Sequence, residues 1–565
     1  MNQAGNLKFG VLCNSTQLQY WQEQVILRLI EDGHRLVIVV MPENEENDSK
    51  QGIQKLLKYP YRNFLFRIYF RFLLKPGAKQ LVDAEYLFKE SVVLRDKGTK
   101  DKNFYVFSKN SLEAIRQSGA QFILRFGFGL IKGEILNITP YGIWSFHHDD
   151  PEVVRGVPSN FWEIYKGHPT NGAILQKLSE KIDAGLILKQ GWFPTILHSW
   201  EGNINQAYFG SIDWPAQVCR DILLNGDRVF QTATKPNPGK LCLAPQNIPF
   251  LKFLLKMGYY RLRYHLRELF CAEQWVTGIT KANPVSLIEG KLAPEDFIWL
   301  KNRNRNEYRA DPSGWFDGAQ LRLFYEYYNY SKPKGSIFTT TYNENGKLSF
   351  GKETIALNES THLAFPFIFN EDQKVYCIPE TSEKNQIELY EWDEVKGRFL
   401  FEKVLIRKIR AVDTIAFRHK GYWWLLFTVK ERSNYELHAW YSPALTGLYQ
   451  PHALNPVKTD IRSARPAGGI FRYKDKIIRP AQNCSPYSGK SVVLNEIEEL
   501  SPTAFRERVF KEIRPMWNSI YNQGMHTLNF SGPYLIVDAK RHIFVPNNFR
   551  NKIRDKFRRL KSWLL

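Results

Sequence analysis

The sequence lacks the usual marks of secreted, membrane-spanning and dinucleotide-binding proteins. Its six cysteines are scattered and form neither a C-x-x-C pair nor a compact disulfide framework. No apolar run has the length of a membrane-spanning helix, and the first residues lack a basic region followed by an apolar core. No G-x-G-x-x-G follows the first strand-like segment. We therefore expect a cytoplasmic protein in a reducing compartment.

Acidic residues are fewer than basic residues. The 565 residues contain 78 Lys and Arg against 57 Asp and Glu, which gives a formal net charge of +21. This excess predicts an anionic partner, which is a nucleic acid, an anionic lipid surface or a phosphorylated substrate. Aromatic residues are abundant, and the 15 Trp, 28 Tyr and 38 Phe favour β structure or surfaces on which sugars stack. At this length two or three domains are expected.

The first part of the chain has the pattern of an α/β domain. Strand-like segments at 8–13 and 35–41 flank an amphipathic segment at 18–30. Farther along, an apolar run ends in Ser145, His147 and His148, and a second strand-like run leads to Asp183. An α/β sheet places its chemistry beyond the carboxyl ends of its strands, so we expect these side chains to form a site.

This stretch resembles the catalytic core of the formyltransferases that use 10-formyltetrahydrofolate, such as the methionyl-tRNA and sugar N-formyltransferases. Their pattern is Asn-x-His, a short loop, a Thr-Gly pair and Asp-x-Gly, and the matching residues here are Ser145, His147, Asn171, Gly172, Asp183 and Gly185. The resemblance implies that 10-formyltetrahydrofolate is the cofactor, that His147 stabilises an oxyanion and that Asp183 is the base. Because Ser145 stands where the family has Asn, either His148 compensates or the chemistry has changed.

Two other interpretations of this histidine cluster stay open. His147 and His148 could be loop histidines with satisfied hydrogen bonds and no catalytic role. Imidazoles and carboxylates also ligate metals, and Asp149 and Asp150 follow directly. In an extended chain, however, only His147 and Asp149 share a face, and no spaced third ligand follows. No metal site is therefore predicted.

Three segments combine Lys and Arg with large apolar residues. They are 55–79, a basic linker helix expected over 236–273 and an amphipathic helix at 548–565. Such helices bind an anionic membrane surface or pack on the protein itself, and both interpretations stay open. The first would make the protein peripheral at the inner face of a membrane.

An internal repeat organises residues 274–547. Five segments share an aromatic, a turn and a strand, and their aromatic residues are Phe316, Phe369, Phe417, Phe471 and Phe530. A period of about fifty residues with a hairpin in each unit predicts the four-stranded blades of a five-bladed β-propeller.

Polar residues recur at corresponding places in this repeat, so we expect them at one mouth of the propeller channel. The candidates are Asp311, Glu326, His362, Glu380, Asp413, Arg465, Arg479, Gln482 and His526. They would form a site for a polar ligand, since charged residues are rarely buried without a partner or a task. Hydrogen bonds that close the blades are the alternative role.

The phrases RADPSGWFDG, AVDTIAFRHKGYWW and SARPAGGIFR in this half resemble the N-terminal domain of plant glucosamine inositolphosphorylceramide transferases. That domain is itself similar to the five-bladed family 43 glycoside hydrolases. The resemblance implies that Asp311 is a base, with Glu380 or Asp413 as the acid or as the group that modulates its pKa. An inverting hydrolase would also need room for a water between its two carboxyl groups.

The sequence thus predicts an α/β formyltransferase-like (Rossmann-like) domain at 1–235, the linker helix at 236–273, an all-β five-bladed β-propeller at 274–547 and the terminal helix at 548–565. Both resemblances imply a transferase that modifies a nucleotide-linked or lipid-linked amino sugar in cell-surface glycan biosynthesis, by formyl or related acyl transfer.

Two alternatives belong to other classes. In one, the propeller is the glycosyltransferase or glycosidase and the first domain is degenerate. In the other, both domains only bind, and the protein is a membrane-associated glycan scaffold. A nucleic acid is not an expected partner, because the propeller takes the place of the tRNA-binding barrel of the methionyl-tRNA formyltransferases.

Overall fold

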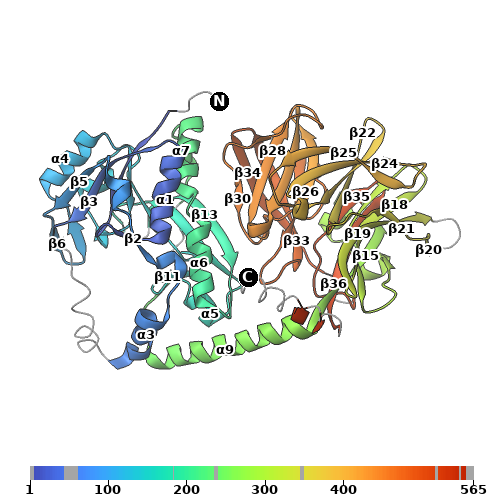
Figure 1. Cartoon of the computed structure of the whole chain (residues 1–565), viewed down its shortest axis with the longest axis horizontal. Coiled ribbons are helices and arrows are strands. Elements are labelled where there is room, and N and C mark those ends of the chain that lie inside the picture. Colours follow the sequence, from blue (N-terminus) through green and yellow to red (C-terminus); the bar gives the residue numbers. More distant parts are fainter. Residues whose placement is uncertain are drawn as a thin grey trace. The chain divides into compact units, whose positions relative to one another are not determined.

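The computed structural model describes residues 5–43, 61–181, 184–234, 239–343, 349–515, 519–545, 549–550 and 552–554 (Figure 1). Asp183 and most of the amphipathic segment 548–565 lie outside these residues. The chain divides into two compact units, residues 1–261 and 262–565, each of which is described by itself. None of the helices in the described ranges combines the length and the apolar character that a membrane crossing needs.

The first unit is built on a seven-stranded mixed sheet with the order β13-β12-β10-β8-β1-β3-β5. The strands are β1 (Lys8–Leu12), β3 (Arg35–Pro42), β5 (Val92–Asp96), β8 (Phe122–Arg125), β10 (Ile143–His147), β12 (Thr170–Lys177) and β13 (Leu186–Pro194). The pairs from β10 to β5 are parallel, whereas β12 and β13 are antiparallel to their neighbours. The parallel part is rich in Val, Ile and Leu, as expected for strands that are covered on both faces.

Helices cover this sheet with their apolar sides. They include α1 (Tyr20–Glu31), α4 (Lys109–Ser118), α6 (Trp200–Gly210) and α7 (Trp214–Asn225). Helix α4 begins where the hydroxyl of Ser108 accepts a hydrogen bond from the backbone N–H of Ser111, and it ends at Gly119 with φ +68°. Within the sheet, the ring of Phe122 stacks between Phe9 and Trp144, at 5.6 and 4.0 Å between centroids.

The long helix α9 (Asn247–Phe270) contains the division between the two units. In the first unit its Phe250 and Phe253 are buried against Phe161 and Trp200. The sequence predicted a basic linker helix over 236–273. In the structure Lys240–Cys242 form strand β14, the helix begins only at Asn247, and after Phe270 the chain turns into strand β15 (Cys271–Lys281). The apolar and β-branched residues of this segment pair with β36 (Tyr534–Phe544) along all of β15, which outweighs its helix propensity.

Within the described residues, the second unit forms five antiparallel sheets. The first sheet contains β15, β16 (Ile298–Leu300), β35 (Leu528–Ser531) and β36. The second contains β17 (Glu307–Phe316), β18 (Leu321–Asn329), β19 (Lys332–Asn343), β20 (Ser349–Phe350) and β21 (Thr354–Leu357). The third contains β22 (Ala364–Glu371), β23 (Lys374–Glu380), β24 (Gln386–Asp393) and β25 (Arg398–Arg407).

The last two sheets follow the same plan. The fourth contains β26 (Ala411–His419), β27 (Tyr422–Val429), β28 (Glu436–Ser442), β29 (Gln450–Pro451) and β30 (Lys458–Thr459), and the fifth contains β31 (Phe471–Tyr473), β32 (Lys476–Asn483), β33 (Ser491–Ser501) and β34 (Ala504–Ile513). In each sheet except the first, consecutive strands of the chain pair side by side, beginning with the first strand of the sheet. The first sheet joins strands from both ends of the unit, which ties those ends together.

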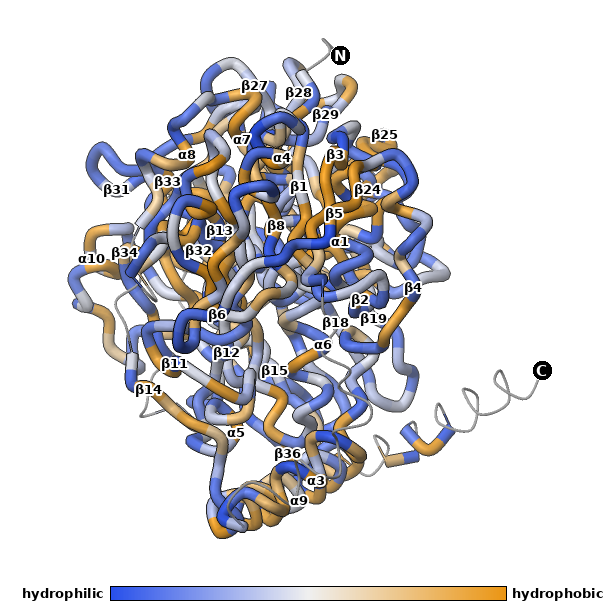
Figure 2. The backbone as a smooth tube through the Cα atoms, turned by 90° about the vertical axis from the view of Figure 1, so that its left-hand side faces the viewer, coloured by the Kyte–Doolittle hydropathy of each residue, from blue (hydrophilic) through white to orange (hydrophobic). Residues whose placement is uncertain are grey.

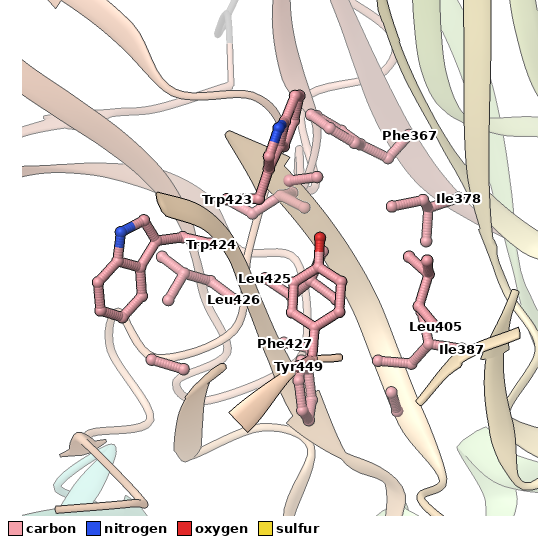
Figure 3. Close-up of a cluster of buried hydrophobic side chains, with 14 of the residues drawn as sticks. Phe367, Ile378, Ile387, Leu405, Trp423, Trp424, Leu425, Leu426, Phe427 and Tyr449 are labelled. Carbon is pink, nitrogen blue, oxygen red and sulfur yellow. The ribbon is translucent and has the colours of Figure 1, made fainter. Parts of the chain in front are cut away.

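Neighbouring sheets pack face to face through large apolar side chains. In Figure 3, Trp424, Leu426 and Phe427 of β27 lie with Ile378 and Ile387 of the third sheet in one buried cluster. The same cluster includes Ile497 and Leu500 of the fifth sheet, so β27 is covered on both faces. The run of apolar residues in β27 follows from this double burial.

A buried ion cluster fastens the fourth sheet to the fifth. Glu507 in β34 accepts hydrogen bonds from Arg479 in β32 at 2.8 and 2.5 Å and from Lys458 in β30 at 2.6 Å. Burial opposes the charge of Glu507, but the two cations outweigh it and lower its pKa to about 2. The cluster is therefore ionised throughout the physiological pH range.

We predict that Glu507→Gln lowers the free energy of unfolding of the second unit by about 3–5 kcal/mol, because it leaves buried cations without a counter-charge. Urea titration followed by tryptophan fluorescence measures the change. Glu431→Gln is the matched control, since Glu431 pairs with Arg410 at 2.6 Å on the surface. It should cost about 0–1 kcal/mol. Equal effects of the two variants would contradict the prediction.

Candidate functional site

The first strands of three successive sheets share an unusual backbone feature. In β17, β22 and β26 the pairing with the next strand shifts register at one place, and the residues there are Asp311, Phe365 and Asp413. Their φ angles are +51°, +41° and +51°, in the left-handed region that non-glycine residues seldom occupy. Strand β22 contacts both β17 and β26, so the three bulges lie on neighbouring strands. Bulges of this kind re-aim side chains and are frequent at functional sites.

The carboxyl group of Asp311 lies in a buried cluster formed with the end of the chain. Its Oδ1 accepts a hydrogen bond from the hydroxyl of Thr527 at 3.1 Å and lies 3.5 Å from His526 Nε2. On its other side, His526 Nδ1 lies 2.5 Å from Asp538 Oδ2. The imidazole therefore bridges two carboxylates.

Asp538 holds this arrangement in place. Its two oxygens accept hydrogen bonds from the backbone N–H groups of His526, Thr527 and Asp311, at 2.8, 3.0 and 3.2 Å. The sequence analysis missed Asp538 and Thr527. The available signal was an aspartate within the apolar strand YLIVDAK, where a charge needs a buried partner.

Asp413 is held by two side chains from the fourth repeat. Its Oδ2 accepts hydrogen bonds from Arg465 Nε at 2.5 Å and from Gln482 Nε2 at 2.7 Å. Gln482 also donates to the carbonyl of Pro466, whereas its buried Oε1 accepts no hydrogen bond from the described residues. The guanidinium of Arg465 adds a hydrogen bond to Asn434 at 3.2 Å, which fixes its plane.

Two glutamates lie on the second strands of their sheets. Glu326 in β18 accepts a hydrogen bond from the hydroxyl of Tyr308 at 3.1 Å, and His362 Nε2 lies 3.6 Å from it. Glu380 in β23 accepts hydrogen bonds from Ser382 at 2.7 Å and from Lys430 at 3.1 Å.

The acidic groups perturb one another. Burial, together with repulsion from Asp413 and Asp538, raises the pKa of Asp311 to about 6, against the attraction of His526 and Arg465. Burial and the charge of Asp311 raise the pKa of Glu326 well above its usual range. Burial disfavours the imidazolium of His526, but Asp538 and Asp311 outweigh it and raise its pKa. The protonation of each of these groups therefore depends on the charge of the others.

Most candidates predicted in this half contribute to these contacts, which we call the carboxyl cluster. It consists of Asp311, Glu326, His362, Glu380, Asp413, Arg465, Gln482, His526 and Asp538. Arg479 is not part of it, because its guanidinium is bound to Glu507 in the ion cluster described above. Arg479 and Gln482 are three residues apart on one strand, so they point to opposite faces.

Metal ligation is a separate question. Ligand atoms of Asp311, His526 and Asp538 lie within 4.8 Å of one another, a spacing that suits a metal ion. The oxygens of Asp538 already accept backbone hydrogen bonds, as described above, and this leaves few lone pairs for a cation. We assign no metal to the cluster.

In the first unit, Ser145 and His147 lie on one side of β10, and the next residue, His148, points to the other side. The hydroxyl of Ser145 accepts two hydrogen bonds, at 3.1 and 3.3 Å, from the guanidinium of Arg125. Arg125 is the residue opposite Ser145 on β8. The imidazole of His147 is partly exposed, with Nε2 3.9 Å from Asp149 Oδ2. The base predicted from the resemblance, Asp183, lies outside the described residues.

His148 lies in the core. Its ring stacks on Tyr208 at 3.6 Å between centroids, packs edge to face with Trp21 and has Nε2 3.2 Å from the hydroxyl of Ser211. Burial and the nearby Lys79 hold its pKa well below the usual range, so the ring is neutral. The expectation that His148 compensates for Ser145 therefore needs correction, since this ring is packed away from solvent.

A pair of buried carboxyl groups lies behind His147. Asp149 Oδ1 accepts a hydrogen bond from the backbone N–H of Asn160 at 2.7 Å. Burial and the neighbouring Glu163 raise the pKa of Asp149 well above its usual range, and burial raises the pKa of Glu163 to about 7. At neutral pH the pair therefore retains a proton, which keeps the buried charge low.

Comparison with known proteins supports the second resemblance over part of the chain. Residues 300–523 match the family model described as "Glucosamine inositolphosphorylceramide transferase 1, N-terminal". A relative of that name from Arabidopsis thaliana is 32% identical over 208 residues, which cover 36% of this chain and 27% of the relative. The chain thus spans about a quarter of the length of the curated relatives it matches.

Solved structures are much less similar. A family 117 glycoside hydrolase from Zobellia galactanivorans is 12% identical and aligns over 48% of this chain and 91% of its own, with a TM-score of 0.31. Glycinamide ribonucleotide transformylase 1 from Symbiobacterium toebii is 14% identical and aligns over 39% and 88%, with a TM-score of 0.27. Scores this low carry no argument, so the formyltransferase resemblance stays a prediction.

The raised pKa of Asp311 has a measurable consequence for stability. The folded protein binds this proton more tightly than the unfolded chain does, so the contribution of Asp311 to stability falls as pH rises from about 4 to about 6. We predict that Asp311→Asn gains stability relative to wild type over this interval, by roughly 2–3 kcal/mol at most. Urea titrations at pH 4 and pH 7 measure it.

The control is Asp317→Asn. Backbone N–H groups of Gln320 and Ala319 lower the pKa of Asp317, so its effect on stability should stay constant between pH 4 and pH 7. A constant difference between Asp311→Asn and wild type over that interval would contradict the raised pKa.

Proposed function

We propose that this protein is a transferase that acts on a lipid-linked or nucleotide-linked sugar, with the carboxyl cluster as its sugar site. The observation that carries the proposal is the position of Asp311, a carboxyl group with a pKa of about 6 on a bulged strand beside Asp413. The similarity to glucosamine inositolphosphorylceramide transferases supports it, since residues 300–523 include both aspartates.

The proposal includes a propeller architecture for the second unit. The five sheets would be its blades, and β17, β22 and β26 would be innermost strands that line a central channel. Two features support this arrangement: first strands of successive sheets contact one another, and the first sheet joins the two ends of the unit. The carboxyl cluster would then lie at the mouth of the channel.

Each group in the cluster suits one part of sugar transfer. Asp311 can accept a proton from an attacking hydroxyl near neutral pH and return it later, because an effective general base has a pKa near the working pH. Glu326, whose pKa is raised by burial and by the charge of Asp311, would donate a hydrogen bond to a sugar oxygen. The guanidinium of Arg465 would bind a phosphate of the donor or of the lipid.

The test is a sugar-transfer assay with nucleotide sugars and lipid-linked acceptors. We expect Asp311→Asn to lower kcat by about a hundredfold or more, the usual contribution of a general base. Asp317→Asn removes a carboxylate from a surface turn of the same strand pair and should leave kcat unchanged. Activity that survives Asp311→Asn, or glycoside hydrolysis without transfer, would overturn the proposal.

Formyl transfer in the first unit is a second candidate function. It is favoured by the partly exposed imidazole of His147 at the carboxyl end of β10, with Arg125 held at Ser145. There 10-formyltetrahydrofolate would supply the formyl group. His147 would stabilise the oxyanion, and Asp183 would accept the proton of an amino sugar.

Calorimetry with 10-formyltetrahydrofolate tests this candidate without knowledge of the acceptor. We predict saturable binding by wild type, weakened at least about tenfold in Asp183→Ala, a loss of about 1.4 kcal/mol. Glu180→Ala, three positions earlier in the sequence, should bind as wild type does. If wild type does not bind, the first unit is an accessory to the sugar site, or the protein is a glycan-binding scaffold.

A further inference from the structure

Helix α9 exposes an apolar stripe along its length. Its large apolar side chains recur at intervals of three or four residues, which places them on one face. Their exposed fractions range from 37% to 70%. The residues of the stripe are Ile248, Leu251, Leu255, Tyr259, Leu262, Leu266 and Phe270.

The stripe has no part in the packing of α9 on the first unit. Phe250 and Phe253 pack on the first unit from the opposite face of the helix, where both are buried among aromatic rings. A surface helix ordinarily turns its apolar side inward and its polar side to water. This helix has an inward apolar side and a second one exposed. Phe270, at the end of the second, stacks on Phe544 and Phe549, and the exposed residues before it require an explanation other than folding.

A neighbouring segment in the first unit has the same character. Asn63 Nδ2 donates to the carbonyls of Ala244 and Pro245 at 3.0 and 2.9 Å, and Asn247 Nδ2 donates to the carbonyl of Tyr61 at 2.6 Å. These bonds hold residues 61–73, which contain α3 (Phe64–Ile68), beside the start of α9 (Figures 1 and 2). The exposed apolar side chains of this segment are Tyr61, Phe64, Leu65, Phe70, Phe72 and Leu73.

Positive charge accompanies both segments. Residues 61–75 and 247–270 contain nine Lys and Arg and one acidic residue, Glu268. Exposed Lys252 and Arg263 each follow a residue of the stripe, so they border it on one side. In Figure 2, apolar and polar residues alternate closely along α9 and α3. We call residues 61–75 and 247–270 together the α9 surface.

We infer that the α9 surface binds an anionic lipid bilayer, with the apolar stripe among the headgroups and upper acyl chains and the cations on lipid phosphates. Amphipathic helices rich in Lys, Arg and large apolar residues bind in this way. The charge points to an anionic partner, and exposed leucine and isoleucine point to hydrocarbon rather than to a nucleic acid, which is bound through phosphates and stacking. Six charged residues in α9 favour a position on the bilayer rather than across it.

The inference goes beyond the proposed function, because the surface would bind lipid whichever sugar the carboxyl cluster accepts. The two ideas are nevertheless compatible. A transferase whose substrate is attached to a lipid gains from a location on the bilayer, where that substrate is concentrated. Binding of empty vesicles separates the inference from any question about the sugar.

Co-sedimentation of the purified full chain with vesicles tests the inference. Wild type should pellet with vesicles of phosphatidylcholine and phosphatidylglycerol, much less with phosphatidylcholine alone, and less at high salt. Leu255→Ser combined with Leu262→Ser should weaken binding at least about tenfold. Lys252→Glu combined with Arg263→Glu should do the same on anionic vesicles, because each reversal removes one attraction and adds one repulsion.

Two exposed apolar residues elsewhere give the matched control. Val395 and Leu448 are 98% and 82% exposed in the second unit, and Val395→Ser combined with Leu448→Ser should bind vesicles as wild type does. Circular dichroism of every variant checks that it is folded.

Three outcomes would overturn the inference. Binding that is unchanged in the stripe variant but lost when Arg550, Lys552 and Arg554 are replaced would assign it to the C-terminal segment. A wild-type dimer that the stripe substitutions convert to a monomer would identify a second copy as the occupant. Salt-sensitive binding of tRNA without vesicle binding would identify a nucleic acid.

Discussion

The second unit depends on one buried carboxylate. Asp538 accepts hydrogen bonds from the backbone of Asp311, near the start of the unit, and from the backbone and imidazole of His526, near its end. A buried charge of this kind persists only because all its partners are in place. The partners are separated by more than two hundred residues, so the ends of the unit must meet before the carboxyl cluster exists. The same closure pairs β15 with β36 along their full lengths.

The bulged strands have a conformational cost and a chemical result. Left-handed backbone at Asp311 and Asp413 is unfavourable for an L-residue, and it persists because the adjoining strands and hydrogen bonds determine it. The bulge displaces each carboxyl group from the regular alternation of the strand. Phe365 occupies the same position in the strand between them and is buried. Two of three equivalent positions thus present acids, and the third contributes to the core.

In the first unit, two consecutive histidines have opposite environments. His147 stays partly exposed, whereas His148 is enclosed by Trp21, Phe146 and Tyr208. Adjacent residues of an extended chain point to opposite sides, so only one of them can face solvent when the other side is covered by helices. Burial also lowers the pKa of His148, which keeps its ring neutral and removes it from proton transfer.

Pattern alone predicted many elements of this protein and most residues of the carboxyl cluster. Periodicity located the α/β strands and the hairpin repeat, and the unusual polar residues of that repeat included Asp311, Asp413 and Arg465. Tertiary structure alone decided which of them meet. It joined Asp311 to the distant Asp538, bound Arg479 to Glu507, enclosed His148 and ended α9 at Phe270 in favour of a strand. The physical reason is that partners, burial and pKa values depend on contacts between residues far apart in the chain, and local sequence patterns do not contain those contacts.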